Sequence, residues 1–165
     1  MPMERNRYED CGDHYIIHMT SNKSCVISKE SYDLVRPYTW CVEGTGYVMS
    51  KTGGKSVKMH RIITGAKKGQ YVDHIDGNPR NNRIENLRLC TKQQNEFNTR
   101  IRSDNTSGYR GVCLSKNDKY RAYLTKDGKQ YNLGCSFDTP ESAAKAYNNF
   151  AIKMFSEFAR LNDVD

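Results

Sequence analysis

Hydrophobic and polar residues alternate in short runs along residues 24–63. The runs TWCV, GYVMS and SVKMHRII are rich in β-forming residues, and the glycine-containing segments EGTG and KTGGK separate them. Such runs between glycine turns are typical of hairpin strands. Ser28 opens the segment SKESYDLV, where its hydroxyl is expected to cap a helical turn, and Trp40 is the expected core anchor. The pattern predicts a β-rich N-terminal part over residues 1–63.

Residues 71–98 have a different pattern. The runs YVDHI and NLRLC predict two short strands, and the polar segment DGNPRNN between them predicts a turn. Thr91 is the expected cap of a helix that follows. Asp76, Asn78 and Asn82 are expected to serve the turn through bonds to their own backbone.

A polar, basic stretch at 99–108, TRIRSDNTSG, has the composition of a linker and marks the expected domain boundary. After it, YRGVCLS, KYRAYLTK and KQYNLGCS predict three strands, and the Asp127-Gly128 pair is typical of a tight hairpin. A helix follows, with Thr139 as N-cap and Pro140 in its first turn. Its apolar stripe is expected to pack on the sheet and comprises Ala143, Tyr147, Phe150, Ala151, Met154 and Phe158.

Composition limits the classes of protein that this chain can represent. Hydrophobic residues make up 36% of its 165 residues. No run approaches the roughly 18 apolar residues of a membrane span, and the N-terminus MPMERNRYED lacks the apolar core of a secretory signal. We therefore expect a soluble protein of the cytoplasm, or of the host cytoplasm if a phage encodes it.

The positive charge is confined to the middle of the chain. The net charge is +7, with +6 over residues 51–99 and +5 over residues 100–135, while residues 1–50 and 136–165 each carry −2. A localised basic region suggests a surface that binds a polyanion. The six cysteines are not spaced as zinc-binding pairs, so we expect reduced thiols packed as small apolar residues.

The segment 71–98 also holds the residues best suited to catalysis. Asp73 offers a carboxylate and Asn95 an amide oxygen, which are the ligands that Mg²⁺ prefers. His74 is the natural general base, because the pKa of an imidazole lies near neutrality. Adjacent strand residues point to opposite faces, so Asp73 and His74 can share a site only if the strand twists or ends there.

Over about 25 residues, the pattern DHIDGN…NNRIENLRLCT…N resembles the HNH nucleases, specifically the phage and intron-encoded homing type. The resemblance implies a ββα-metal fold, metal ligation by Asp73 and Asn95, base catalysis by His74 and a loop-bracing role for Asn86. Many members of the family have histidine where this chain has Asn95, which favours Mg²⁺ or Mn²⁺ over zinc, with one ion per active site. The family often carries a His-Arg pair where His60 and Arg61 stand.

Several histidines have open or ordinary roles. His60, with Arg61, either contacts the scissile phosphate or caps a strand. His14 and His18 show no partner in the neighbouring sequence and are interpreted as surface or packing residues.

The C-terminal segment resembles the APETALA2-type DNA-binding domain over about 50 residues. The matches are YRGV, the run LGCSFDTPESAAKAY and the late Ala159, Leu161 and Asn162. The resemblance implies a three-stranded sheet that reads the major groove. Alternation alone directs Tyr120, Ala122, Leu124, Tyr131, Leu133, Val112 and Leu114 inward, which leaves a basic, hydrogen-bonding outer face. Plant members carry Arg or Trp at several positions where this chain has Cys113, Ser115, Thr125 and Asn132, so the target bases cannot be transferred.

These observations predict an α+β protein in three segments. Residues 1–98 form an HNH endonuclease domain, with a β-rich part at 1–63 and a ββα-metal core at 71–98; residues 99–108 form a linker. Residues 109–165 form an APETALA2-like domain, a three-stranded antiparallel sheet packed on one helix. The expected DNA contacts are Arg100, Arg102, Arg110, Lys116, Lys119, Arg121, Tyr123, Thr125, Gln130 and Asn132.

The function expected from this architecture is that of a homing-type, site-specific nicking endonuclease from a phage or mobile element. It would act as a monomer on double-stranded DNA, with no membrane and no protein partner. The alternatives are a DNA-binding regulator that keeps an HNH scaffold only as structure, and a small RNA-binding protein, which fits the charge but not the groove-reading sheet.

Overall fold

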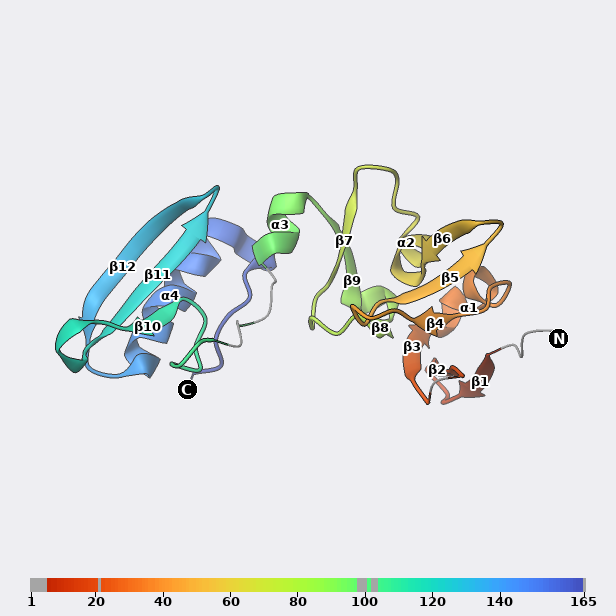
Figure 1. The fold of residues 1–165 in the computed structure, drawn as a ribbon, viewed down its shortest axis with the longest axis horizontal. Helices are drawn as coiled ribbons and strands as arrows, with labels where there is room; N and C mark the ends of the chain where they lie inside the picture. The colour runs from red at the N-terminus through yellow and green to blue at the C-terminus, as the bar shows by residue number, and fades with distance from the viewer. Residues whose placement is uncertain (1–5, 21, 98–100, 102–103, 165) are drawn as a thin grey trace. The chain divides into compact units, whose positions relative to one another are not determined.

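The computed structural model describes residues 6–20, 22–97, 101 and 104–164, and the chain divides into two compact units, Met1–Lys92 and Gln93–Asp165 (Figure 1). Both units mix sheet and helix, as the sequence predicts. The strands of the first unit are β1 (Arg7–Asp10), β2 (His14–His18), β3 (Ser24–Ser28), β4 (Cys41–Val42), β5 (Val48–Thr52), β6 (Lys55–Lys58), β7 (Tyr71–His74), β8 (Asn81–Asn82) and β9 (Leu87–Cys90). Its short helical segments are η1 (Lys29–Ser31), α1 (Tyr32–Val35), α2 (Met59–Thr64) and η2 (Ile84–Asn86).

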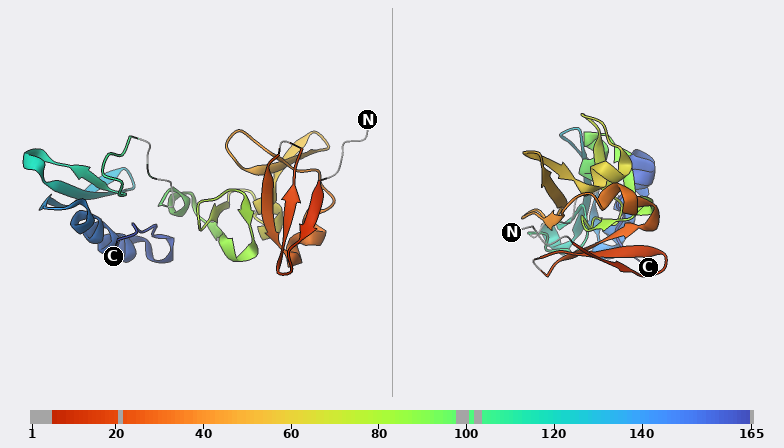
Figure 2. Two further views of the ribbon diagram at one scale, coloured as in Figure 1. Left: turned by 90° about the horizontal axis from the view of Figure 1, so that it is seen from below. Right: turned by 90° about the vertical axis from the view of Figure 1, so that its right-hand side faces the viewer.

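The N-terminal strands form a sheet in the order β1-β2-β3-β8. The first three strands are antiparallel neighbours and lie side by side in the left view of Figure 2, whereas β8 pairs with β3 in parallel. Ile17 and Ile27 are fully buried, and Trp40 packs into the same core at 1% exposure, which confirms its role as an anchor.

Two predictions for this part of the chain are wrong. Ser28 makes no side-chain bond that caps the turn after it, because its hydroxyl instead bonds residues of η2. His14 does have a partner in the neighbouring sequence, since its Nδ1 lies 2.6 Å from Asp13. His18 has its partner further away, with Nε2 2.7 Å from Glu9, and both contacts lie at the surface, where these two histidines were expected. The Glu9 contact crosses between paired strands, so neighbouring sequence could not reveal it.

The second sheet has the order β4-β5-β6 and leads directly into α2. The run SVKMHRII was expected to be a strand throughout, but it turns helical at Met59. Met59, Ile62 and Ile63 all pack against the N-terminal core, at the three- and four-residue spacing of one helix face. Gly65 ends the helix at φ 62°, a left-handed conformation that glycine adopts without strain.

The strands of the second unit are β10 (Val112–Leu114), β11 (Tyr120–Lys126) and β12 (Lys129–Phe137), which form one antiparallel sheet. Its helical segments are α3 (Lys92–Phe97, whose first residue closes the first unit), η3 (Lys116–Asp118), α4 (Pro140–Phe155) and η4 (Ser156–Phe158). Helix α4 packs on the sheet, and its N-cap is Thr139, whose hydroxyl accepts a bond from the Ser142 amide (Figure 1).

Side-chain burial in the second unit follows the predicted alternation with one exception. Ala122 and Leu124 are buried under α4, but Leu114 is 55% exposed, contrary to the prediction. Leu114 is the last residue of the short strand β10, where the chain leaves the sheet for η3. Gly111 meets the sheet closely: a Cβ there would lie 2.4 Å from the Tyr123 carbonyl oxygen and 2.4 Å from the Tyr147 ring.

The six cysteines are free thiols. Only Cys25 is buried, whereas Cys11, Cys41 and Cys135 are exposed, so the expectation that all six pack as apolar residues is wrong for these three. Among the described residues, no helix is long and apolar enough to span a membrane.

Candidate active site

Asp73 and His74 end strand β7 and are both 5% exposed. Strand β7 pairs antiparallel with β9, so that Asp73 lies opposite Arg88 and His74 lies opposite Leu87. The chain turns at once, with the Gly77 amide donating to the His74 carbonyl oxygen at 2.8 Å. The strand therefore ends at the histidine, which is the condition under which neighbouring residues can serve one site.

The Asp73 carboxylate is held by Arg88. Arg88 Nε and Nη2 donate to Asp73 Oδ2 at 2.9 and 2.7 Å. The two side chains are 6% and 18% exposed, so this ion pair is largely removed from water. A buried carboxylate requires a cationic partner, and in this arrangement Arg88 supplies it. The sequence does not predict a role for Arg88, because the long loop between β7 and β9 leaves the register of the two strands open.

His74 is enclosed by two further rings. Tyr47 precedes β5 and His60 lies on α2, and their centroids are 5.9 and 5.2 Å from that of His74. The Tyr47 and His60 rings are themselves 5.3 Å apart. The His74 and His60 rings meet edge to face, at 90°. Tyr47 and His60, which come from two other segments of the chain, thus pack against the ring of the candidate base.

Burial keeps both imidazoles neutral. It is the main cause that lowers the pKa of His74, opposed by the contact with Asn82 and by the charges of Asp76 and Asp73. Burial, followed by repulsion from His74 and nearby cations, lowers the pKa of His60 to about 3. A neutral imidazole at physiological pH is the form that can accept a proton.

Asn86 braces the loop between β7 and β9. Its Oδ1 accepts a bond from the Asp76 amide at 3.0 Å, and its Nδ2 donates to Asp76 Oδ1 at 3.0 Å and to the Asn81 carbonyl oxygen at 2.7 Å. Burial alone would raise the pKa of Asp76, but bonds from the Asn78 amide, Asn81 and Asn86 outweigh it and lower that pKa. The Asp76 and Asn78 side chains accept from the backbone two residues on, which confirms their predicted place in the turn.

Asn82 differs from the other turn residues. It donates to the Pro79 carbonyl oxygen within the turn, but its Oδ1 also lies 3.3 Å from His74 Nε2. The sequence predicts a role for Asn82 in the turn alone. No local pattern distinguishes it from Asn81, because the contact with His74 depends on the parallel pairing of β8 with β3.

His60 and Arg61 occupy different environments on α2. His60 is 5% exposed, and its Nδ1 has no hydrogen-bond partner among the described residues. The Arg61 guanidinium instead donates to the backbone carbonyls of Ala66, Lys67 and Gln70, at 2.8 to 3.1 Å. Arg61 therefore holds the loop after α2, and of the pair only His60 lies beside His74.

Asn95, the expected second metal ligand, lies on α3 and is partly buried. It belongs to the second unit, whereas Asp73 belongs to the first. No group of three or more His, Cys, Asp or Glu side chains suited to a metal occurs in the described part of the chain.

The expected DNA-contacting residues of the second unit have mixed surroundings. Lys116, Lys119, Thr125, Gln130 and Asn132 are exposed. Lys119, just before β11, pairs with Asp138, just after β12. Within the sheet, Arg121 bonds Gln130 at 2.8 Å and lies 5.7 Å from the centre of the Tyr123 ring. Arg110 is half-buried, and burial is the main cause that lowers its pKa. Arg100 and Arg102 lie outside the described residues.

Comparison with known proteins places this geometry in context. Residues 57–97 match the family described as HNH endonuclease. The protein named "Uncharacterized HNH endonuclease L560", from Acanthamoeba polyphaga mimivirus, is 39% identical over 145 residues, which cover 84% of this chain and 74% of that protein. Protein 3.8 of Escherichia phage T7 is 40% identical over 94 residues, covering 56% of this chain and 76% of that protein.

More distant similarity extends to a solved structure. DNA endonuclease I-HmuI of Bacillus phage SP01 is 35% identical over 86 residues, covering 47% of this chain and 49% of that protein. A structure titled "DNA binding and cleavage by the HNH homing endonuclease I-HmuI" has a TM-score of 0.31 at 18% identity, covering 90% of this chain and 91% of that one.

Proposed function

The chain belongs to the HNH endonuclease family, and on that basis we propose that it cuts DNA by hydrolysing phosphodiester bonds, with His74 as general base. The observation that carries the proposal is a buried, neutral His74 directly after a buried carboxylate, Asp73, at the end of one strand. In this reaction, a water molecule loses a proton to the imidazole and attacks the phosphorus atom. One P–O ester bond breaks, and the alkoxide that leaves takes a proton from water. Asn86 serves by keeping the loop after His74 in one conformation.

The residues available also fit a divalent cation. Asp73 is a buried carboxylate, and its oxygens suit a hard metal, with which Arg88 would compete for Oδ2. Asp73 and, from the family pattern, Asn95 would hold one Mg²⁺ or Mn²⁺ per active site. When bound, the cation would stabilise negative charge on the phosphate oxygens. His60, beside His74, is the candidate for contact with the scissile phosphate. The role of Arg61 is to hold the loop after α2 through its backbone carbonyls.

We propose further that the C-terminal part recognises DNA. The division follows the sequence prediction: residues 1–98 cut, 99–108 link and 109–165 form an APETALA2-like domain that supplies affinity for the target. An outer sheet face with Lys119, Arg121 and Gln130 supports this proposal, because cations and amides bind phosphates and base edges. The enzyme would act as a monomer that nicks one strand at a specific site.

The charge-matched variants Arg121→Ala and Lys145→Ala test the recognition role. Arg121 is on the sheet face, whereas Lys145 is exposed on α4. Each variant therefore removes one positive charge, but from a different surface. We expect Arg121→Ala to weaken binding to duplex DNA more than Lys145→Ala does, in titrations at matched salt. Equal losses would indicate only non-specific charge attraction. Competition with RNA duplexes separates DNA recognition from the RNA-binding alternative.

Plasmid cleavage tests the nuclease itself. Supercoiled plasmids that carry a library of inserts are incubated with Mg²⁺ and either the wild type or His74→Ala, and new strand ends are captured by sequencing. We expect site-specific nicks from the wild type and none from the variant. Equal cleavage by both proteins would refute the role of His74. A wild type that binds DNA but never cuts would favour the regulator that keeps an HNH scaffold only as structure.

A further inference from the structure

Asn82 is buried directly beside the proposed general base. Its exposure is 0%, and it ends β8, inside the loop that joins β7 to β9. Asn82 Oδ1 lies 3.3 Å from His74 Nε2, and Asn82 Nδ2 lies 3.3 Å from the carbonyl oxygen of Pro79. A buried amide needs hydrogen-bond partners at both of its ends, and these two contacts provide them.

The Pro79 contact determines which end of the amide faces His74. A carbonyl oxygen only accepts hydrogen bonds, so the Asn82 amino group points to Pro79 and the amide oxygen points to His74. That oxygen also only accepts, so His74 Nε2 carries the hydrogen. A neutral imidazole has one N–H and one lone pair, which assigns the lone pair to Nδ1. The two contacts together select one of the two neutral forms of His74.

The N-terminal sheet holds Asn82 in this position through its backbone. Strand β8 lies parallel to β3, with Ile27 opposite Asn82, and the Val26 amide donates to the Arg80 carbonyl oxygen at 2.9 Å. Ile27 is fully buried in the N-terminal core. The location of Asn82 is consequently tied to the N-terminal core through β3, whose residues lie more than 50 positions earlier in the chain.

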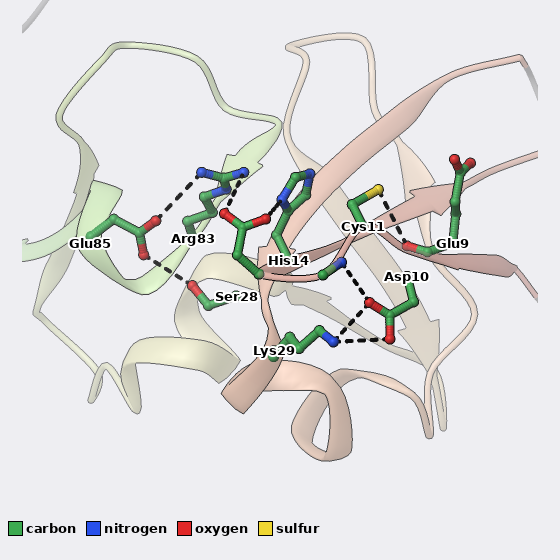
Figure 3. A network of polar contacts seen from close by, with 10 residues as sticks. Glu9, Asp10, Cys11, His14, Ser28, Lys29, Arg83 and Glu85 are labelled. Atoms are coloured by element: carbon green, nitrogen blue, oxygen red, sulfur yellow. Dashed lines mark hydrogen bonds and ion pairs between the residues drawn. The ribbon is translucent and has the colours of Figure 1, made fainter.

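Side chains fasten the segment after β8 to the same sheet. Ser28 Oγ accepts a bond from the Ile84 amide at 2.8 Å and donates to Glu85 at 3.1 Å. Arg83 lies 3.8 Å from Glu85 and 3.9 Å from Asp13, in the turn between β1 and β2 (Figure 3). These contacts attach the loop to the N-terminal sheet although most of its residues are polar.

We propose that Asn82 is a positioning residue that keeps His74 in the form with hydrogen on Nε2, so that Nδ1 takes the proton from water. The inference rests on the general-base role proposed for His74. When the proton passes to Nδ1, Nε2 keeps its hydrogen, and the resulting imidazolium remains bonded to Asn82 Oδ1. The N-terminal sheet thereby acquires a function, because it holds Asn82 against the imidazole.

Nitrogen NMR on the full chain tests the proposal directly. Long-range ¹H–¹⁵N spectra of protein with ¹⁵N-histidine distinguish the two neutral forms, and His74→Gln identifies the signals of His74 among the four histidines. We expect the Nε2–H form in the wild type and in Asn82→Asp, which keeps an acceptor oxygen. Asn82→Leu, of similar size but without the acceptor, should show a mixture that includes Nδ1–H. A wild-type pattern in Asn82→Leu would overturn the proposal.

Kinetics separate the positioning role from general damage to the fold. We expect Asn82→Leu to lower kcat about 10- to 100-fold, the usual range for losing a partner that orients a reactive group, with KM for DNA nearly unchanged. Asn82→Asp should recover most of that loss. The control is Val35→Ala, a buried residue of α1 outside the β3–β8 pair, which should lower the melting temperature but leave the His74 form unchanged. If Val35→Ala alters the His74 form as much as Asn82→Leu does, Asn82 has no specific role.

Two further outcomes would also test the role proposed for Asn82. If Asn82→Leu changes the form of His74 while kcat stays constant, His74 is not the base, and the proposed mechanism fails rather than the Asn82 contact. If Asn82→Leu does not fold, Asn82→Asp remains decisive, because loss of the Nε2–H form there refutes the proposal.

Discussion

The Arg88→Leu substitution removes the cation that faces the Asp73 carboxylate across the β7–β9 pair. Asp73 is 6% exposed at its side chain, so the carboxylate would be left nearly buried without its partner. Removing one partner of a buried ion pair lowers the free energy of unfolding by about 3–5 kcal/mol. Because the Arg88 side chain is 18% exposed, we expect a loss of about 2–4 kcal/mol here. With a urea m-value of about 2 kcal/mol per molar, the unfolding midpoint should fall by roughly 1–2 M.

Divalent cations should reverse much of this loss. A cation that binds Asp73 takes the place of the missing guanidinium, and saturation at about 100 times its dissociation constant adds about 2.7 kcal/mol of stability. The wild type should gain less, because Arg88 competes for the same carboxylate oxygen. Trp40 is the sole tryptophan and is buried in the first unit, so its fluorescence reports unfolding of that unit.

The matched control is Arg83→Leu. Arg83 is 30% exposed and its ion-pair distances are 3.8 and 3.9 Å, so its loss should cost less than about 1 kcal/mol and should not depend on Mg²⁺. In the double variant Asp73→Asn/Arg88→Leu the stability should return in part, but the response to Mg²⁺ should disappear. Equal Mg²⁺ stabilisation of the wild type and Arg88→Leu would refute the competition between Arg88 and the metal.

Three other substitutions give expected outcomes of different kinds. Burial lowers the pKa of His60 to about 3, whereas the pKa of an unfolded histidine is about 6.5. As the pH decreases, the unfolded chain therefore binds this proton before the folded protein does. The contribution of His60 to stability is complete above about pH 6.5 and falls by about 1.4 kcal/mol per pH unit towards pH 3. His60→Phe should flatten that slope in urea unfolding between pH 7.5 and 5.5, and an unchanged slope would contradict the assignment. Asn86→Ala should cost about 1–3 kcal/mol by Trp40 fluorescence, since it leaves the part-buried Asp76 amide and Asn81 carbonyl oxygen without their partner. The exposed Asn78→Ala should cost under about 1 kcal/mol. Gly111→Ala should destabilise the second unit by more than about 2 kcal/mol in circular dichroism melts while Trp40 unfolding stays constant, because a Cβ there meets backbone and ring at 2.4 Å.

Local patterns in the sequence were sufficient at several places where the determinant lies within a few residues. Thr139 and Pro140 predicted the start of α4, and the alternation along β11 predicted which side chains lie under that helix. The pattern around Asp73 and His74 located the candidate site for the same reason, because both residues lie next to each other at a turn.

The tertiary structure alone decided how that site is completed. Arg88 reaches Asp73 through a strand register that the long intervening loop leaves open, and Asn82 reaches His74 because β8 pairs in parallel with β3. His60 joins the site since α2 packs Met59 into the N-terminal core. Such contacts depend on burial and on pairing between segments tens of residues apart, and the residues themselves carry no local pattern for either. The sequence by itself therefore determined which residues are chemically suited to react, and the tertiary structure determined which neighbours hold them in place.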